Sequence, residues 1–293
     1  MSTLTHGQGI PLAITLEEKC DTLRNTLYQE PPPLPVPVVT NLTQRVPNEL
    51  SYTEITYIEV SKALFSTNSN TAPGPSQIAY TLIKWAWPIA ANLIIALFQR
   101  CLNMGYYPVQ WRWAMVVALR KSNKANYSQP WAYRLITLLE CLGKLLEKIV
   151  AKRLSYMVGR HELILGTQFG GWSNSSTINV AMTFVHDVYT AWNQNMVTSA
   201  LTFDIKDFFD FVNHQCLLSE MQKRYIPLEY LKWTANFLDK HEAAICVDGI
   251  RGSLKPVKNG IPQGSPVSPI LASFYSAGLL EVFQNANAFP IPC

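Results

Sequence analysis

The acidic segment around Asp204 is the part of this chain best suited to carry chemistry. Asp204 directly follows a short run that is predicted to be a β-strand, residues 199–203, and Asp207 and Asp210 come soon after it. A carboxylate at the end of an apolar strand is costly unless a cation is held there. A bend after Asp204 would bring its carboxylate and the carbonyl of Ile205 to one metal ion. The alternative is that three solvated acids lie on a turn, which is the usual state of an isolated Asp-rich turn.

A second segment with chemical potential is the loop 259–269, which reads Asn-Gly-Ile-Pro-Gln-Gly-Ser-Pro-Val-Ser-Pro. Gly264 allows another backbone to approach closely, Gln263 offers an amide, and Ser265 can cap the helix that follows. Taken alone, this pattern is typical of an ordinary loop that leads into a helix. Its position in the chain, at this distance after the acidic segment, favours a functional role over that of an ordinary loop.

The clearest helix predicted from the sequence begins near Gly143 and carries a basic stripe. Lys144, Lys148 and Lys152 recur at intervals of four residues, on the side opposite the apolar face. A solvated helix face and a contact with a phosphate backbone both fit this pattern. The apolar face consists of Leu142, Leu145, Leu146, Ile149, Val150, Leu154 and Met157.

The elements around these segments alternate between helices and short strands, which predicts a mixed α/β fold. Strands are expected at 113–119 and 133–139, and Asp248-Gly249 predicts a hairpin between 243–247 and 254–257. Helices are also expected at 55–65, 80–104, 177–193, 216–224, 228–240 and 269–283, with Ser51 and Glu54 in a capping box before the first. The helical stretch 80–104 should be mostly buried, as one or two helices, with Pro88 at a start or a kink.

The first part of the chain has a different composition from the rest. Residues 1–50 are polar and include the Pro-rich run 31–37, which favours an extended polyproline conformation. We expect this part to be a linker or a surface strap. Ordered structure is expected to begin at Ser51, and residues 51–293 should form one continuous domain.

The composition says more about where the protein is located in the cell than about its function. The net charge of +4 permits a polyanionic partner without requiring one. The six cysteines lie far apart, without zinc-binding spacing, as expected of reduced thiols in an intracellular protein of the nucleus or cytoplasm. The longest apolar stretch, 85–98, is interrupted by Pro88 and is too short to cross a hydrocarbon layer of about 30 Å. No membrane partner is expected.

Seven sequence blocks from residue 70 onward occur in the same order as in one known family. Together they resemble the reverse transcriptases of non-LTR (LINE-type) retrotransposons, most closely the fungal members, over most of the chain from about residue 51. The blocks are 70–75 (NTAPGP), Lys121, 133–136 (YRLI), 143–148 (GKLLEK), 168–170 (QFG), 203–206 (FDIK) with 209–210 (FD), and 260–266 (GIPQGSP). Seven blocks in the right order indicate common ancestry.

This resemblance implies a fold and a reaction. The fold would be the fingers and part of the palm of a reverse transcriptase, with an antiparallel palm sheet backed by helices. The reaction would be RNA-directed synthesis of DNA, with an RNA template, a DNA primer and dNTPs as partners and no predicted protein partner. Asp204, with the carbonyl of Ile205, would bind Mg²⁺ or Mn²⁺ ions that activate the primer 3′-hydroxyl and stabilise the leaving pyrophosphate.

The resemblance also implies roles for residues around the nucleotide and the template. Phe209 would be the steric gate at which a bulky ring excludes a ribose 2′-hydroxyl. Gln263 and Gly264 would lie near the template base. Ser265 would contact nucleic acid, and the stripe of three lysines could follow a phosphate backbone.

Two cations would bind the triphosphate of the incoming nucleotide in such an enzyme. Lys121 and Arg134 match the two finger motifs that reach this group, the arginine in bidentate fashion. Arg120 or Lys124 could take the place of Lys121, since both lie close to it in the sequence.

Several positions depart from the family pattern. Trp172 and Ser175 stand where arginines are common, and Leu135 replaces the usual proline. No Asp-Asp box occurs in the 293 residues, so Asp204 would be one of three expected metal-binding carboxylates. We therefore expect an incomplete palm without a thumb, and a chain that is inactive by itself. The alternative is a catalytically dead retroelement remnant that acts at most as a nucleic-acid-binding module.

Overall fold

The computed structural model describes residues 3–4, 13–28, 41–171, 176–200, 202, 204–205 and 207–286. The sequence predictions for the Pro-rich run 31–37, Trp172, Ser175, Phe203 and Lys206 lie outside these residues. Within them the helices are α1 (Leu16–Leu27), α2 (Tyr57–Phe65), α3 (Tyr80–Asn103), α4 (Cys141–His161), α5 (Thr177–Asn193), α6 (His214–Lys223), α7 (Leu228–Leu238) and α8 (Ser268–Ala286). The strands are β1 (Trp113–Arg120), β2 (Tyr133–Leu138), β3 (His241–Val247) and β4 (Ile250–Val257).

The four strands form one sheet in the order β2-β1-β3-β4. β1 pairs with β2 and β3 with β4 in antiparallel fashion, whereas β1 and β3 are parallel. The predicted mixed α/β fold is therefore confirmed, and the sheet is antiparallel except for its central pair. Since β1 and β3 are far apart in the sequence, a crossover through several helices joins them, as parallel pairing requires.

The β3–β4 hairpin forms where its turn residues predicted it. Asp248 and Gly249 have φ angles of 53° and 79°. Positive φ at both central residues is the backbone of the type I′ turn, whose twist matches that of the flanking strands. The turn therefore fixes the register in which Val247 pairs with Ile250.

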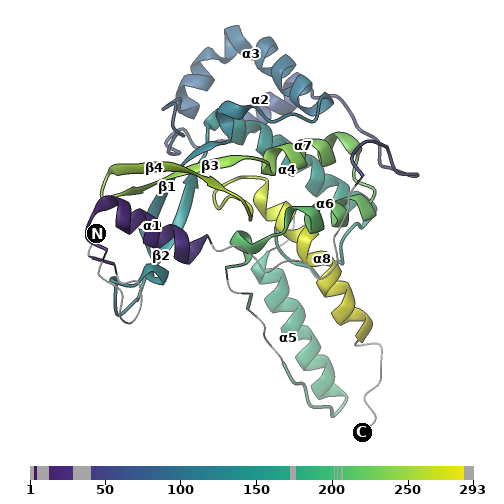
Figure 1. Cartoon of the computed structure of the whole chain (residues 1–293). Coiled ribbons are helices and arrows are strands. Elements are labelled where there is room, and N and C mark those ends of the chain that lie inside the picture. The colour runs from purple at the N-terminus through teal and green to yellow at the C-terminus, as the bar shows by residue number, and fades with distance from the viewer. Residues whose placement is uncertain are drawn as a thin grey trace.

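The buried side chains form two hydrophobic cores. The larger core joins α2, α3, α4, α6, α7 and α8, and α4 contributes most of its own length to it. The smaller core lies between α1 and one face of the sheet, around Leu23, Val116 and Ile245. Figure 1 shows α1 beside the sheet, while α5 and the end of α8 project away from the body.

Helix α1 lies in the part of the chain that was predicted to be a linker. Thr15 and Glu18 form a capping box at its start. An ion pair joins Asp21 to Lys255 at 2.5 Å, and Nη2 of Arg24 donates to the carbonyl of Ala243 at 2.9 Å. The expectation that ordered structure begins at Ser51 is therefore wrong. The helix is short, and its docking on the sheet stabilises it more than its own propensity does.

The start of α2 also differs from the prediction. Thr56 caps this helix by accepting a hydrogen bond from the backbone N–H of Glu59 at 3.2 Å. The predicted capping box at Ser51 and Glu54 lies five residues too early, because the pattern of a hydroxyl residue three positions before a glutamate occurs twice here, at Ser51 and at Thr56.

Helix α3 is one continuous helix that passes through Pro88. Its inner face packs into the larger core, but its outer face is exposed, so the prediction that it is mostly buried is wrong. At 24 residues it is longer than the apolar stretch 85–98 and, by length and composition alone, long enough to cross a membrane. The packing of Ile83, Trp87 and Phe98 against the core is that of a core helix instead.

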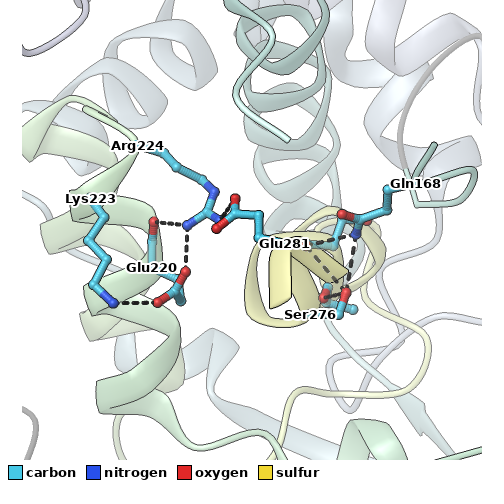
Figure 2. Close-up of polar contacts among 8 residues, drawn as sticks. Gln168, Glu220, Lys223, Arg224, Ser276 and Glu281 are labelled. Carbon is cyan, nitrogen blue, oxygen red and sulfur yellow. Dashed lines mark hydrogen bonds and ion pairs between the residues drawn. The ribbon is translucent and has the colours of Figure 1, made fainter. Parts of the chain in front are cut away.

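Helix α8 is held in place by contacts from two sides (Figure 2). On one side, Nε2 of Gln168 donates to the carbonyl of Ser273 at 2.9 Å and to Oγ of Ser276 at 3.1 Å. On the other, Arg224 at the end of α6 donates to Glu281 at 2.5 Å. The block 168–170 therefore packs on the helix that follows the loop 259–265.

Arg224 also bonds within its own helix. Its Nη1 lies 2.5 Å from Oε2 of Glu220, and Lys223 lies 2.7 Å from the other oxygen. Burial alone would raise the pKa of Glu220, but the hydrogen bonds from Lys223 and Arg224 outweigh it and lower this pKa. Arg224 is buried and Lys223 is exposed, so the arginine should contribute most of the stabilisation.

We predict that Arg224→Met lowers the free energy of unfolding by about 1–3 kcal/mol, because it leaves Glu220 partly buried without its main partner. Lys223→Met is the matched control and should change it by less than about 0.5 kcal/mol, since solvent screens an exposed pair. Urea denaturation measures both. Equal losses in the two variants would contradict a clamp centred on Arg224.

Candidate active site

The acidic segment and the loop 259–265 meet in the structure through backbone hydrogen bonds. The N–H of Ile261 donates to the carbonyl of Phe209 at 2.8 Å, and the N–H of Gly260 donates to that of Val212 at 3.2 Å. Nε2 of His214 donates in turn to the carbonyl of Gly260 at 2.8 Å. Burial lowers the pKa of His214, which keeps the ring neutral. We call this contact between 209–214 and 260–261 the junction.

The same loop is bonded to strand β2. The N–H of Thr137 donates to the carbonyl of Gln263 at 2.8 Å. Gly264 has a φ of +118°, and a Cβ atom on it would lie 2.7 Å from the carbonyl oxygen of Thr137. Only glycine fits this position, because any side chain would push the loop off the strand. The close backbone approach predicted for Gly264 is therefore confirmed.

A buried carboxyl group holds the other end of the loop. Oγ of Ser265 donates to Glu147 of α4 at 2.5 Å, and the hydroxyl of Tyr107 donates to the other oxygen of Glu147 at 2.7 Å. Glu147 is fully buried. Burial raises its pKa to about 7, although the hydrogen bonds from Ser265 and Tyr107 act in the opposite direction.

The position of Ser265 changes what its hydroxyl can do. The residue is buried, and its Oγ also accepts from the N–H of Val267 at 3.2 Å, in the turn before α8. This bond is not the predicted cap of the helix itself, because Val267 lies outside α8. Because its hydroxyl is already bonded to Glu147, Ser265 supports the loop in this structure. Sequence reasoning missed Glu147, which it treated only as one letter of the block 143–148.

Gln263 and Asp210 line one small cavity between the loop and β2. Its volume is about 30 Å³, comparable to the space of one water molecule, and Tyr28 and Thr137 form part of its wall. Burial and the charge of Asp207 raise the pKa of Asp210 to about 7, while the charge of Lys121 acts against them. A carboxyl group at the junction is therefore readily protonated.

Tyr28 brings the end of α1 to this cavity. Burial and the charge of Asp210 raise its pKa to about 12, and a hydrogen bond with Thr137 acts in the opposite direction. The cavity is too small for a nucleotide, and Tyr28 and Gln263 both form part of its wall. Neither Tyr28 nor Asp210 was predicted to be a site residue, although Asp210 belongs to the quoted motif.

Asp204 and Ile205 are exposed in an irregular segment. The predicted strand 199–203 does not form at its described residues 199, 200 and 202, and the other two lie outside the described part of the chain. Among the described residues, no three His, Cys, Asp or Glu side chains gather as a metal site. The residues described here thus offer a metal ion one candidate carboxylate, Asp204, and they do not form a complete site.

The other predicted nucleotide-binding residues lie on different sides of the junction. Phe209 is half-buried against the larger core, with its ring 6.0 Å from that of Phe208. Arg134 is exposed on β2, and strand alternation places it on the face opposite Leu135, which lines the small cavity. Lys121 follows β1 directly and is half-buried. The structure places Gln263 beside the junction, in the wall of the small cavity with Asp210, but leaves Arg134 outside it.

The three lysines of α4 do not share one exposed face. Lys144 is buried, and its Nζ donates to the carbonyl of Ala72 at 3.1 Å. Nζ of Lys148 donates to Oγ of Ser66 at 2.9 Å, and Lys152 is exposed. The predicted basic stripe is therefore wrong for Lys144, which holds the block 70–75 against α4 because this loop covers the first turns of the helix.

We predict that the stability difference between Glu147→Gln and the parent protein depends on pH. Folding raises the pKa of Glu147 from 4.5 to about 7, so its contribution to stability is full below about pH 4.5 and is lost as the pH rises to about 7. The free energy of unfolding of the parent should therefore fall relative to the glutamine variant over this window, by up to about 3 kcal/mol.

Urea denaturation at a series of pH values measures this difference. Glu54→Gln, which changes an exposed carboxylate in the same way, is the control. A difference for Glu147→Gln that is flat between pH 4.5 and 7, or that has the opposite slope, would contradict a protonated Glu147 under the loop.

Comparison with known proteins extends this picture. Residues 120–290 match the family described as reverse transcriptase (RNA-dependent DNA polymerase), which is more than half of the chain. The chain is 28% identical over 222 residues to a probable RNA-directed DNA polymerase from transposon BS of Drosophila melanogaster, covering 75% of this chain and 24% of that protein. It is 27% identical over 230 residues to the RNA-directed DNA polymerase from mobile element jockey of the same species, covering 78% and 25%.

A probable RNA-directed DNA polymerase from transposon X-element of Drosophila melanogaster is likewise 27% identical over 236 residues, with 80% of this chain and 26% of that protein covered. The chain thus spans about a quarter of the length of these relatives. The region that matches the family, residues 120–290, includes β2, α4, the acidic segment and the loop 259–265, so the junction lies within it. The chain belongs to the reverse transcriptase (RNA-dependent DNA polymerase) family, and within it to the LINE-type enzymes of non-LTR retrotransposons.

Proposed function

We propose that this chain is the fingers and first palm motif of an RNA-directed DNA polymerase, the part that binds template, primer and nucleotide. The observation that carries the proposal is the junction, where the acidic segment and the loop 259–265 are held together and to β2. The relatives named above are polymerases of mobile elements, which supports the same reaction for the whole protein. The domain would run over residues 51–293, with α1 docked on its sheet.

Nucleotide binding would fall to residues around the junction. Gln263 would line the pocket near the template base, and Gly264 would allow the loop to lie close to β2. Phe209 would form the steric gate. Arg134 is exposed and able to reach a phosphate, and Lys121 lies at the end of the adjacent strand. Since the cavity that Gln263 lines is smaller than a nucleotide, nucleotide binding there would require the end of α1, at Tyr28, to move aside.

Metal binding is the part of the proposal that these residues support least. Asp204, with the carbonyl of Ile205, would contribute to Mg²⁺ or Mn²⁺ ions, which when bound activate the primer 3′-hydroxyl and stabilise the leaving pyrophosphate. One exposed carboxylate provides too few ligands for two metal ions. We therefore assign nucleotide and nucleic-acid binding to this chain, and nucleotidyl transfer to the protein only when the remaining ligands are present.

A second candidate function is binding of nucleic acid without catalysis, as in a degenerate element. The exposed, unassembled position of Asp204 favours it. In both cases RNA and DNA are the expected partners, inside the cell and in the nucleus or the cytoplasm. Relationship to the fungal members stays a prediction from the motifs, and the relatives named above are from Drosophila melanogaster.

We predict that Asp204→Ala abolishes primer extension on an RNA template with Mg²⁺ and dNTPs, by a factor of at least about 10³. The measurement uses a version of the protein extended through an Asp-Asp box. Asp187→Ala, which removes an exposed carboxylate from α5, is the control and should leave the rate unchanged. Extension that survives Asp204→Ala would reject the metal-ligand role of Asp204.

We also predict that the chain binds a template–primer duplex with an affinity that falls as salt rises. Lys152→Gln should reduce the slope of log K against log salt by about 0.7–0.9, the effect of one phosphate contact. Asp204→Ala should leave this binding unchanged. Lys223→Gln, an exposed lysine on α6, serves as the control. Absence of any binding at low salt would leave neither candidate function standing for this chain.

A further inference from the structure

The outer face of α3 has no charged residue between Lys84 and Arg100. Its exposed side chains are large and apolar, and exposure rises towards the middle of the helix: 48% for Leu82, 74% for Trp85, 93% for Ile89, 74% for Leu93 and 39% for Leu97. Even the one nearby cation is turned inward, since Nζ of Lys84 donates to the carbonyl of Thr67 at 2.7 Å. Solvated helix faces carry charged and polar residues, so this face is built for contact.

The face cannot be the side of a helix that spans a bilayer, because the opposite face of α3 is part of the larger core. Ile83, Trp87, Ile94 and Phe98 are buried there against α2, α4 and α7. Figure 1 shows α3 at the periphery of the molecule, with its outer side open and with α5 and α8 at the opposite end. A partner on α3 therefore leaves the junction unobstructed.

The exposed apolar residues extend about equally far on both sides of Ile89, from Leu82 before it to Leu97 after it. If two copies of α3 cross in antiparallel fashion at Ile89, Trp85 of one copy faces Leu93 of the other, and Leu82 faces Ala96. The row runs at intervals of three and four residues, which keeps all of it on one side of the helix. A two-fold interface requires a surface that is complementary to itself, and this arrangement places large side chains opposite smaller ones.

The face supplies about three quarters of the area that a stable dimer buries. Taking about 200 Å² for a large apolar side chain, the five exposed residues present roughly 600 Å² per copy. The exposed Ala86, Pro88 and Ala96 extend this surface. A stable interface buries about 800 Å² on each partner, so α3 supplies most of it. No charge pair is needed and no like charges meet, because the central part of the face has none.

We propose that the outer face of α3 binds a second copy of this chain, in an antiparallel two-fold arrangement centred on Ile89. This goes beyond the polymerase function and does not depend on it. It also revises the expectation that the protein has no protein partner.

The first test is the oligomeric state of the whole chain, measured by sedimentation velocity. The parent should be a dimer, and Ile89→Arg should make it a monomer with an unchanged circular dichroism spectrum, since Ile89 is not part of the core. Ile178→Arg is the matched control, because it places the same charge on another exposed apolar helix, α5. A parent that is monomeric at all concentrations, or a dimer lost through Ile178→Arg but not Ile89→Arg, would overturn the proposal.

The second test is the direction of the helices, measured by disulfide cross-linking. A mixture of Leu82→Cys and Ala96→Cys chains should cross-link beyond the background of the parent, because these positions face each other in the antiparallel arrangement. Leu82→Cys alone should not exceed that background. Efficient cross-linking of Leu82→Cys with itself would indicate parallel helices and would reject the proposed interface.

A lipid surface is the rival occupant of this face. Flotation with phosphatidylcholine vesicles distinguishes the two: the proposal expects the parent chain to stay in the soluble fraction as a dimer. A monomer that floats with the vesicles, and that Ile89→Arg returns to solution, would show that α3 binds lipid instead of a second copy.

Discussion

The carboxyl group of Glu147 joins the three parts of the molecule on which the candidate site depends. It lies in α4, which has more buried residues than any other described helix, and it accepts hydrogen bonds from Tyr107 and from Ser265. Tyr107 packs edge-on to Trp233 and Phe237 of α7, so the same group connects the aromatic core to the loop. A buried carboxyl is costly, and its cost is offset here only because both oxygens are bonded.

The loop that Glu147 supports has little freedom elsewhere. The N–H of Thr137 holds the carbonyl of Gln263, and Gly264 is in contact with the same strand. Only glycine fits at position 260, where φ is 79°, because a Cβ atom there would lie 2.7 Å from the carbonyl oxygen of Phe209. Bonds at successive positions thus fix the loop against β2, α4 and the acidic segment together. This rigidity is what a site that must position a template base requires.

Most of the fold follows from local pattern. The periodicity of α4, the apolar run of β1 and the turn at Asp248-Gly249 each predicted their element within one or two residues at most boundaries. These elements follow from residues that are neighbours in the sequence, and so a pattern can identify them. Parallel pairing of β1 with β3 could not be predicted in the same way, because it depends on contacts between residues far apart.

The candidate site was less predictable than the fold. Ser265 was placed in the right loop, but its bond to Glu147 is a contact between distant segments, and so is that of Lys144 to Ala72. Periodicity indicates which residues share a helix face, but not which loop covers that face. The predicted strand at 199–203 shows the same limit of sequence patterns. A strand needs a neighbouring strand to pair with, and β1–β4 form their sheet without this segment.

The parallel pair at the centre of the sheet has a consequence for how the chain folds during synthesis. Val117 pairs with Cys246, which is made 129 residues later, and α1 packs on β3 from an even earlier position. The ribosome therefore releases β1 and β2 as a hairpin whose inner edge stays unpaired until β3 emerges. The rate of translation, and any chaperone that shields that edge, should decide how much of this protein reaches its native state.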